Sequence, residues 1–431
     1  MTASAQPSVE KVPPRAFFAM AGFRTLLFTR FGAQFSDGMF RAGLAGAVLF
    51  NPERGADPLT IAGGFAVLLL PYSLIGPFAG ALLDRWDRRR VLIVANLLRG
   101  TAIVATAVAV GFGWSGIELF VLALVVEGIS RFVGSGLSAS LPHVVPPGTL
   151  VTANALATTL GSLVAVLGGG AAIGLRTLIG TGNSGSGWTT AAAMLPTLIA
   201  AAIARRFARG RLGPDRVDEP RDALLAVARG LIDGARAALA VPSVVAGFVA
   251  LLAHRASYGI SLLLTVLLLR YSFTDLGLLK AGLPGLGQLA AMAGAGILLA
   301  GLLTPRLVRR LGRRRAIPGA LLLAAATQAG LGLPMTLPTV LVASFVISSA
   351  GQVVKLCVDS TIQHDVPDEA RGRVFSLYDT LLNITQVIAV SLAATVVPLT
   401  GRSVPLLLAA TVVYLLGTAG YLVVAHRSRA E

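Results

Sequence analysis

Long apolar stretches alternate with short polar segments along nearly the whole chain. A helix needs roughly 17 to 25 apolar residues to cross the hydrocarbon core of a bilayer, and the chain holds about twelve stretches of that length. The first six are 25–50, 59–83, 91–112, 117–140, 152–175 and 188–204, and the second six are 242–269, 277–304, 316–333, 337–358, 374–397 and 404–425. The pattern predicts an all-α membrane protein.

A repeated polar segment indicates that the chain is duplicated. The charge cluster at 80–90, between the second and third stretches, recurs in degraded form at 305–315, between the eighth and ninth. Repeats of several spans, related by an axis along the membrane normal, are a known transporter architecture. We therefore expect two pseudo-symmetric six-helix bundles, 1–204 and 242–431, joined by a polar cytoplasmic linker at 205–241.

Composition and charge support a membrane location. The chain is 55% hydrophobic and 13% charged, which lies outside the usual balance of a soluble domain. Its net charge of +16 would suggest nucleic-acid binding in a soluble protein, but the basic residues gather in alternate connections. Only four of the connecting arginines fall on the opposite side: Arg54, Arg176, Arg270 and Arg402. This asymmetry predicts a multi-pass protein of the plasma (inner) membrane with both termini cytoplasmic, and it argues against nucleic acid as a partner.

The sequence lacks recognisable catalytic, cofactor and metal motifs. No phosphate-binding loop of the form G-x-x-x-x-G-K-[ST] occurs, and neither H-E-x-x-H nor G-x-S-x-G is present. The single cysteine, Cys357, and the four histidines show no ligand spacing. We expect a protein that is not an enzyme and that uses neither a cofactor nor a metal.

Polar side chains form helical stripes in four of the spans. Residues spaced by three or four share one face of a helix, and a charge at the centre of a lipid-facing helix costs about 2.5 to 3.5 kcal/mol. These residues are therefore expected to face a protein interior or a water-filled cavity. The stripes are Arg30, Gln34, Asp37 and Arg41 in span one, Glu127 and Arg131 in span four, His254, Tyr258, Ser261 and Thr265 with Arg255 beside them in span seven, and Ser348, Gln352, Lys355 and Asp359 in span ten.

Two motifs resemble those of the major facilitator superfamily. The segment Gly80-x-x-x-Asp84-Arg85-x-x-Arg88-Arg89 is similar to the signature loop of that superfamily, and Arg131-x-x-Gly134-x-Gly136 is similar to its second motif. The loops at 141–154 and 366–376 resemble those of its twelve-helix drug and siderophore exporters. Asp87 stands where the signature usually has glycine, and Arg309 in the second copy replaces Asp84. The resemblance implies that spans one, four, seven and ten line a central cavity.

The resemblance and the stripes together assign expected roles. The carboxylates Asp37, Glu127 and Asp359 are proton-coupling candidates, and a structural ion pair of Asp37 with Arg30, Arg41 or Arg131 is the alternative. The cytoplasmic gate motif comprises Gly80, Asp84, Arg85, Arg88 and Arg89; in it, Asp84 either latches onto the N-terminal end of the eleventh span near Arg373 or serves as a solvated anchor. The cavity and substrate candidates are Arg30, Gln34, Arg41, Arg131, His254, Arg255, Tyr258, Gln352 and Lys355.

These features predict a monomeric secondary transporter. We expect it to export a small amphiphilic or drug-like molecule by alternating access, in exchange for protons. The segment 33–37 also resembles lysophospholipid flippases of the same superfamily, so translocation of a lipid stays open as an alternative. A membrane scaffold or receptor without transport is the alternative from another class.

Overall fold

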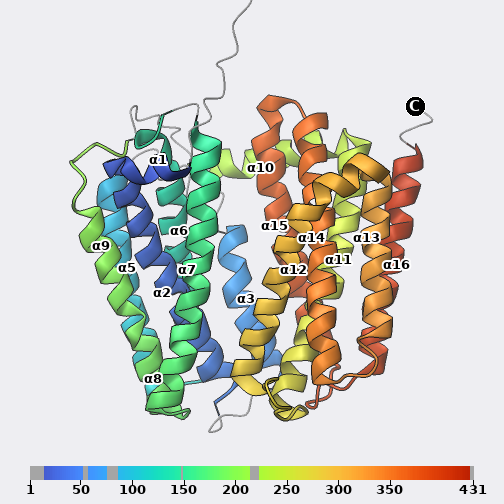
Figure 1. Cartoon of the computed structure of the whole chain (residues 1–431), viewed down its shortest axis with the longest axis horizontal. Helices are drawn as coiled ribbons and strands as arrows, with labels where there is room; N and C mark the ends of the chain where they lie inside the picture. Colours follow the sequence, from blue (N-terminus) through green and yellow to red (C-terminus); the bar gives the residue numbers. More distant parts are fainter. Residues whose placement is uncertain (1–13, 52–56, 75–85, 147–148, 214–222, 428–431) are drawn as a thin grey trace, which may run out of the picture. The chain divides into compact units, whose positions relative to one another are not determined.

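The computed structural model describes residues 14–51, 57–74, 86–146, 149–213 and 223–427, and within these ranges it consists of helices joined by turns and short irregular segments. Within those ranges the extended structure consists of one isolated bridge, between Leu276 and Leu279. The predicted all-α membrane fold is confirmed. Figure 1 shows the long helices that make up the structure.

Each predicted span contains a helix. The elements of the first half are α1 (Pro14–Ala19), α2 (Ala21–Leu49), α3 (Pro58–Leu74), α5 (Arg88–Gly111), α6 (Ile117–Ala139), α7 (Leu150–Ile179), α8 (Asn183–Ala192) and α9 (Met194–Ala204), with a short 3₁₀ turn at Leu141–His143. Those of the second half are α10 (Ala223–Leu239), α11 (Pro242–Tyr271), α12 (Gly282–Leu311), α13 (Arg313–Gly330), α14 (Leu337–Asp365), α15 (Asp368–Ala394) and α16 (Val404–Arg427). Residues 75–83 of the second predicted span lie outside the described residues.

Eight helices in the described ranges are long and apolar enough to cross a membrane. They include α5, α7, α11, α12, α14, α15 and α16, and also α8 with α9, which together form one span at Asn183–Ala204. Helix α2 is 29 residues long, but Arg30, Asp37 and Arg41 lower its mean hydropathy. The charged residues that lower the hydropathy of α2 are therefore the same residues that belong to the polar stripe of span one.

The chain divides into two compact units. Unit 1 comprises residues 1–54 and 74–223, and unit 2 comprises residues 55–73 and 224–431. The division falls inside the expected linker, and the linker helix α10 belongs to unit 2. Most of α3, which we expected in the N-terminal bundle, is also grouped with unit 2. The predicted domain limits at 204 and 242 remain a prediction.

The helix pairings inside unit 1 recur inside unit 2. In unit 1, α2 packs against α7 and α9, and α5 packs against α6 and α9. In unit 2, α11 packs against α15 and α16, and α13 packs against α14 and α16. Spans in equivalent positions of the two halves thus choose equivalent partners, which is the arrangement that a duplicated sequence predicts.

Glycines allow the closest helix contacts in both units. A Cβ atom added to Gly38 of α2 would collide with the carbonyl oxygen of Ala165 in α7, and one on Gly168 would collide with that of Phe35. In unit 2, a Cβ on Gly296 of α12 would collide with the carbonyl oxygen of Phe345 in α14. Small residues at such positions let membrane helices approach closely, where van der Waals packing holds them together.

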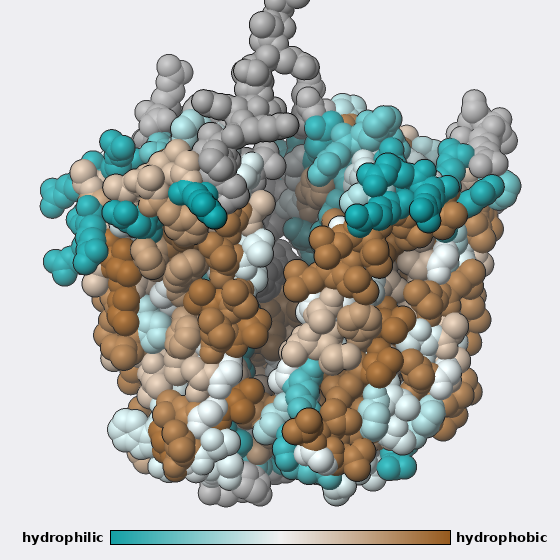
Figure 2. Space-filling model, viewed as in Figure 1, coloured by the Kyte–Doolittle hydropathy of each residue, from teal (hydrophilic) through white to brown (hydrophobic). Residues whose placement is uncertain are grey.

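Apolar side chains cover much of the outer helix surface of each unit. In Figure 2 they form broad brown areas over the helices, and hydrophilic side chains gather near helix ends. The exposed apolar residues include Leu98, Val108 and Val166 in unit 1 and Leu298, Leu302 and Leu416 in unit 2. Such a surface is costly in water and favourable in hydrocarbon, so it suits a multi-pass membrane protein.

Candidate functional site

Asp37 of α2 forms a buried ion pair with Arg99 of α5. The Arg99 guanidinium donates to Asp37 Oδ1 at 3.0 Å, and only 1% of the Arg99 side chain and 17% of the Asp37 side chain are exposed. Arg99 also donates to the carbonyl oxygen of Ala33 at 2.9 Å and to Ser130 Oγ of α6 at 3.4 Å. One arginine thereby connects three helices of unit 1 around a single carboxylate.

A second ion pair joins α2 to α6. Arg41 Nη2 donates to Glu127 Oε2 at 2.7 Å, and Arg41 Nε donates to Glu127 Oε1 at 3.0 Å, so the contact is bidentate. Glu127 is almost completely buried, whereas 37% of the Arg41 side chain is exposed. Bidentate guanidinium–carboxylate contacts are among the strongest polar contacts in proteins and fix the relative position of both groups.

The expected partners of Asp37 were wrong. The sequence suggested Arg30, Arg41 or Arg131 as structural partners, but the structure assigns Arg99 to Asp37 and Arg41 to Glu127. The sequence did carry a signal for Arg99, since an arginine inside the apolar stretch 91–112 needs a partner as much as one in a polar stripe does. That arginine was missed because it is the only charged residue of the stretch 91–112 and so forms no polar stripe.

The remaining unit 1 candidates lie near these pairs along the chain. Arg30 is buried and donates to Ser138 Oγ of α6 at 3.1 Å. The Oε1 atom of Gln34 is buried without a hydrogen-bond partner among the described residues, and it lies where a Cβ on Gly161 would fall. Arg131 is half-buried, one helical turn after Glu127.

The described part of the gate motif holds unit 1 together at the start of α5. Arg88 is buried and donates to the carbonyl oxygens of Ala139 at 2.9 Å and Leu212 at 3.3 Å, and Arg89 donates to that of Arg205 at 3.1 Å. The carbonyls of Ala139 and Arg205 lie at or just beyond the ends of α6 and α9, where cations are favoured by the helix dipole. The Asp87 side chain accepts a hydrogen bond from the backbone N–H of Arg89 at 3.1 Å and caps α5.

The other gate residues, Gly80, Asp84 and Arg85, lie outside the described residues, so the expected latch stays a prediction. We predicted from the sequence that Asp84 contacts the chain near Arg373, which lies in α15. In the structure, Arg373 Nη1 donates to Asp233 Oδ2 of the linker helix α10 at 3.4 Å. A Cβ on Gly234 would lie 2.7 Å from the Arg373 carbonyl oxygen, so α10 and α15 are in close contact.

Unit 2 contains a polar cavity of about 110 Å³ between α11, α12 and α14. Five of the sequence candidates line it, namely His254, Arg255, Tyr258, Gln352 and Lys355. Ser348 from the span-ten stripe lines it as well. The polar faces of spans seven and ten thus border one cavity within unit 2. The central cavity that the resemblance implies, shared by spans one, four, seven and ten, stays a prediction.

His254 is fixed on one side of this cavity by two tyrosines and a glycine. Its Nδ1 lies 3.3 Å from the hydroxyl oxygen of Tyr414 in α16, and its ring stacks on Tyr258 with centroids 6.0 Å apart. A Cβ on Gly351 of α14 would collide with the His254 ring. Gly351 therefore makes room for a buried imidazole in the core of unit 2.

The cations of the cavity have different partners. Lys355 Nζ donates to Asp359 Oδ2 at 2.7 Å, one turn along α14, and the Tyr378 hydroxyl donates to Asp359 Oδ1 at 3.0 Å. Arg255 Nη1 donates to the side-chain oxygen of Gln386 in α15 at 3.3 Å. Lys355 is thus neutralised by a carboxylate, whereas the hydrogen-bond partner of Arg255 is an uncharged amide.

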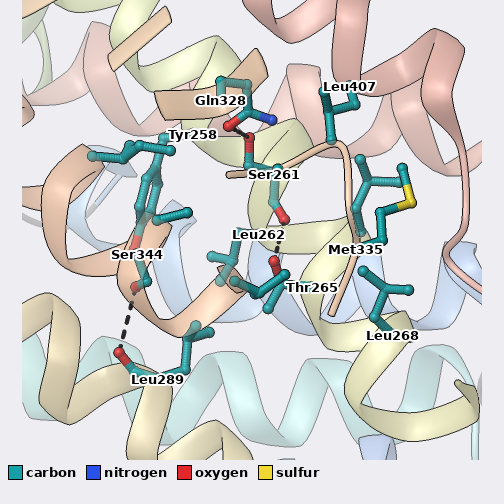
Figure 3. Close-up of a pocket in the computed structure, with 15 residues that line it drawn as sticks. Tyr258, Ser261, Leu262, Thr265, Leu268, Leu289, Gln328, Met335, Ser344 and Leu407 are labelled. Atoms are coloured by element: carbon teal, nitrogen blue, oxygen red, sulfur yellow. Dashed lines mark hydrogen bonds between the residues drawn. The ribbon is translucent and has the colours of Figure 1, made fainter. Parts of the chain in front are cut away.

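Tyr258 also lines a second, mostly apolar cavity of about 60 Å³. Figure 3 shows Leu262, Leu268, Leu289, Met335 and Leu407 around it. Its few polar contacts are internal, since Ser261 Oγ bonds to Gln328 Oε1 at 3.0 Å and Ser344 Oγ to the Leu289 carbonyl oxygen at 3.5 Å. Tyr258 therefore stands between a polar and an apolar space.

Within the described ranges, no group of three or more His, Cys, Asp or Glu side chains is arranged to hold a metal ion. Cys357 is buried in the core of unit 2. The chemistry that these residues offer is therefore charge pairing, proton binding and hydrogen bonding.

The chain matches a large family of membrane transporters along most of its length. The family model described as Major Facilitator Superfamily matches residues 30–390. Two relatives are 42% identical over 421 residues, which cover 96% of this chain and 94% of each relative. They are the uncharacterized MFS-type transporters Mb0038c of Mycobacterium bovis and Rv0037c of Mycobacterium tuberculosis.

Solved transporter structures share the fold at low sequence identity. The peptide transporter POT in complex with sulfate has a TM-score of 0.71 at 15% identity, covering 98% of this chain and 97% of that one. The nucleoside transporter NupG has a TM-score of 0.65 at 12% identity, covering 95% of this chain and 99% of that one. These similarities concern the fold and not the substrate.

Proposed function

Because this chain belongs to the Major Facilitator Superfamily, whose members are membrane transporters and not enzymes, we propose that it is a secondary active exporter of a small amphiphilic or drug-like molecule. It works by alternating access and exchanges its cargo for protons. The observation that carries the coupling part is the ion pair of Asp37 with Arg99, a carboxylate inside the membrane region held by a fully buried arginine.

Protonation of Asp37 changes the contact between three helices. When Asp37 is protonated, every hydrogen-bond acceptor of the buried Arg99 among the described residues is uncharged, namely the Asp37 carboxyl group, the Ala33 carbonyl oxygen and the Ser130 hydroxyl. An uncompensated buried charge is strongly unfavourable, and removing one member of a buried pair typically costs about 3–5 kcal/mol. Proton binding at Asp37 therefore favours a different arrangement of α2, α5 and α6, which is the requirement for coupling protons to a conformational change.

Glu127 and Asp359 are the secondary proton-binding candidates. Each is held by one basic partner, Glu127 by Arg41 and Asp359 by Lys355. The side chains of both partners are about one third exposed, so they can be hydrated when the carboxylate is protonated. Their protonation therefore perturbs the surrounding helices less than protonation of Asp37 does.

An amphiphilic cargo agrees with the two spaces beside Tyr258. One is lined by charged and polar side chains and the other mainly by aliphatic ones. Ligand sites usually combine an apolar lining with a few polar groups that fix orientation. A sugar would need many more hydrogen-bonding groups than these walls supply.

Translocation of a lysophospholipid is the second candidate. It is favoured by the segment 33–37, which contains Asp37 and resembles lipid flippases of the same superfamily. The two candidates differ in what moves, so one reconstituted system tests both.

The test is cargo flux in proteoliposomes under an imposed pH gradient, with a cationic dye, a zwitterionic drug and a fluorescent lysophospholipid as probes. We expect the gradient to drive net flux of dye or drug in the wild-type protein. In Asp37→Asn, gradient-driven flux is lost while counterflow exchange of cargo continues, because exchange needs no net proton movement. Asp275→Asn is the matched control, since its carboxylate lies in an exposed ion pair between α11 and α12.

Three results contradict parts of the proposal. Equal gradient-driven flux in wild type and Asp37→Asn shows that Asp37 does not couple proton movement to transport. Movement of the lysophospholipid alone replaces the export proposal with the lipid one. Absence of flux for every probe, with folded protein in the vesicles, favours a membrane scaffold or receptor.

A further inference from the structure

Arg255 is a charged residue inside a membrane helix that lacks a carboxylate partner among the described residues. It is half-buried in α11 and lines the polar cavity of unit 2. Its single hydrogen bond within the described ranges goes to the Gln386 side-chain oxygen. A guanidinium carries five N–H donors, so most of its hydrogen-bonding capacity is available to something in the cavity.

The cavity as a whole carries an excess positive charge. Its other formally charged wall residue, Lys355, is neutralised by Asp359, and the second oxygen of that carboxylate already accepts the Tyr378 hydroxyl. Asp359 is therefore satisfied by two donors from unit 2. This leaves Arg255 without a carboxylate partner among the described residues of unit 2.

An uncompensated cation at this depth points to a ligand. Ionisable groups within membrane spans are costly and usually mark substrate or ion pathways. The planar guanidinium matches the geometry of carboxylate and phosphate, which it binds through two parallel hydrogen bonds. The cavity has a volume of about 110 Å³. A single water molecule needs about 10–15 Å³ of such volume, so a group of several heavy atoms fits.

We propose that the cavity of unit 2 binds an anionic group, a carboxylate or a phosphate, with Arg255 as its charged anchor. Gln386 holds the guanidinium in place, and Ser348 and Gln352 supply further hydrogen bonds from the facing helix. The apolar cavity on the other side of Tyr258 receives a short aliphatic part. The inference deepens the proposed function and rests on it for the identity of the ligand as cargo, which becomes an anionic amphiphile.

Arg255 differs from Arg30, an arginine of span one that also donates to an uncharged side chain. Arg30 is only 5% exposed and donates to Ser138, so its head group is packed against protein. Arg255 has more exposed surface and faces a space large enough for a ligand. The anionic group is therefore assigned to unit 2.

The experiment measures binding and needs no transport. Three fluorescent probes share a dansyl-labelled undecyl chain and differ at the other end, which carries a carboxylic acid, a primary amide or a phosphate monoester. Fluorescence enhancement with purified wild-type protein in detergent at neutral pH gives each affinity. We expect the acid and the phosphate to bind at least tenfold more tightly than the amide, since a hydrogen bond to a charged group is worth roughly tenfold to hundredfold in affinity.

Variants of Arg255 assign the selectivity to one side chain. Arg255→Gln is expected to weaken acid binding roughly tenfold to hundredfold and to leave amide binding unchanged. Arg255→Lys keeps the charge without the planar fork and is expected to fall between the two. Arg402→Gln, at an exposed arginine between α15 and α16, is the matched control and keeps wild-type selectivity.

Equal affinity of the wild-type protein for acid, phosphate and amide overturns the inference. Equal losses of acid and amide binding in Arg255→Gln also overturn it, because they show a structural role. A preference for phosphate over carboxylate indicates a phospholipid head group, and the reverse indicates a carboxylic acid. Charge-selective binding without flux in proteoliposomes contradicts the proposed function alone, and flux without charge selectivity contradicts this inference alone.

Discussion

The two units pair their membrane-embedded carboxylates in different ways. In unit 1, Asp37 and Glu127 each bind an arginine of another helix, so both ion pairs connect separate spans. In unit 2, Asp359 binds Lys355 on its own helix and accepts a hydrogen bond from Tyr378 of α15. The contacts between helices are repeated in the two halves, but the ion pairs of the helices are not.

This difference suggests a division of labour between duplicated halves. Ion pairs between helices link protonation to helix arrangement, which suits the coupling proposed for unit 1. A carboxylate satisfied largely within its own helix leaves Arg255 available for a ligand, which suits the recognition proposed for unit 2. Four predictions test how far the comparison holds.

The largest effect is expected from removing Asp37. Asp37→Ala should lower the free energy of unfolding by about 3–5 kcal/mol, because it leaves the buried Arg99 without its countercharge. Glu127→Ala should cost less, about 1.5–3 kcal/mol, because its partner Arg41 is 37% exposed. Unfolding in detergent, followed by tryptophan fluorescence, measures both.

The double variant Asp37→Ala/Arg99→Leu supplies the control for that experiment. It removes both charges and should recover a large part of the lost stability. Two results would show that burial of the arginine does not determine how much stability is lost. One is an equal loss of unfolding free energy in Asp37→Ala and Glu127→Ala, and the other is no recovery of stability in the double variant.

A second prediction concerns a feature in which the halves agree. Gly38→Ala should destabilise the protein by about 1–3 kcal/mol, because the new methyl group meets the Ala165 carbonyl oxygen. Gly296→Ala in unit 2 should have a similar cost through Phe345. Melting temperatures in detergent measure the loss.

Gly134→Ala is the matched control for both glycine variants. A Cβ at this helical position meets nothing within 4 Å. Alanine is favoured over glycine in a helix by up to about 1 kcal/mol, so the control should be neutral or slightly stabilising. A stable Gly38→Ala protein would mean that α2 and α7 separate easily.

The third prediction concerns the charge of the unit 2 cavity. Asp359→Asn releases Lys355 from its ion pair and adds one uncompensated positive charge to the wall. Affinity for the dansyl acid should rise roughly tenfold, since a charge several Å away in a medium of intermediate dielectric contributes about 1–2 kcal/mol. Binding of the amide probe, which should not change, is the control. Weaker acid binding would mean that Asp359 positions the ligand.

The smallest effect is expected outside the membrane spans. Hydrogen bonds from the Ala281 backbone and Lys280 hold the pKa of Asp275 below its ordinary value of 3.8. A lowered folded-state pKa gives a stabilisation that is complete above the unfolded value and is lost as the pH falls through the folded one. Asp275→Asn should therefore lower the melting temperature slightly at neutral pH and not in strong acid. A loss that is independent of pH would assign the effect to packing.

Much of the helical framework was predictable because apolar length is a local property. The twelve predicted stretches each contain a helix, and α6 and α11 begin at the predicted residues. Chain direction changes at positions that the sequence also marks, such as Gly312, whose φ of 75° ends α12 within the degraded second copy of the charge cluster. Helix ends were less accurate where a helix continues past its apolar core, as α12 does to Leu311.

The polar stripes were also predictable, because residues three or four apart must share a helix face. In spans seven and ten these faces border the polar cavity of unit 2, and the expectation that spans seven and ten share a cavity came from the family resemblance. The sequence could not predict that a bare glycine, Gly351, would face His254, because that contact depends on the distance and rotation of two helices.

The sequence by itself determined that this is a duplicated, all-α membrane protein with charges within its spans, because composition, span length and helical periodicity act within single helices, and its motifs added the resemblance to a transporter family. Only the tertiary structure decided which charges meet. Asp37 pairs with the isolated Arg99, and Arg255 with an amide, since partner choice depends on which helix faces are in contact and how far apart they lie.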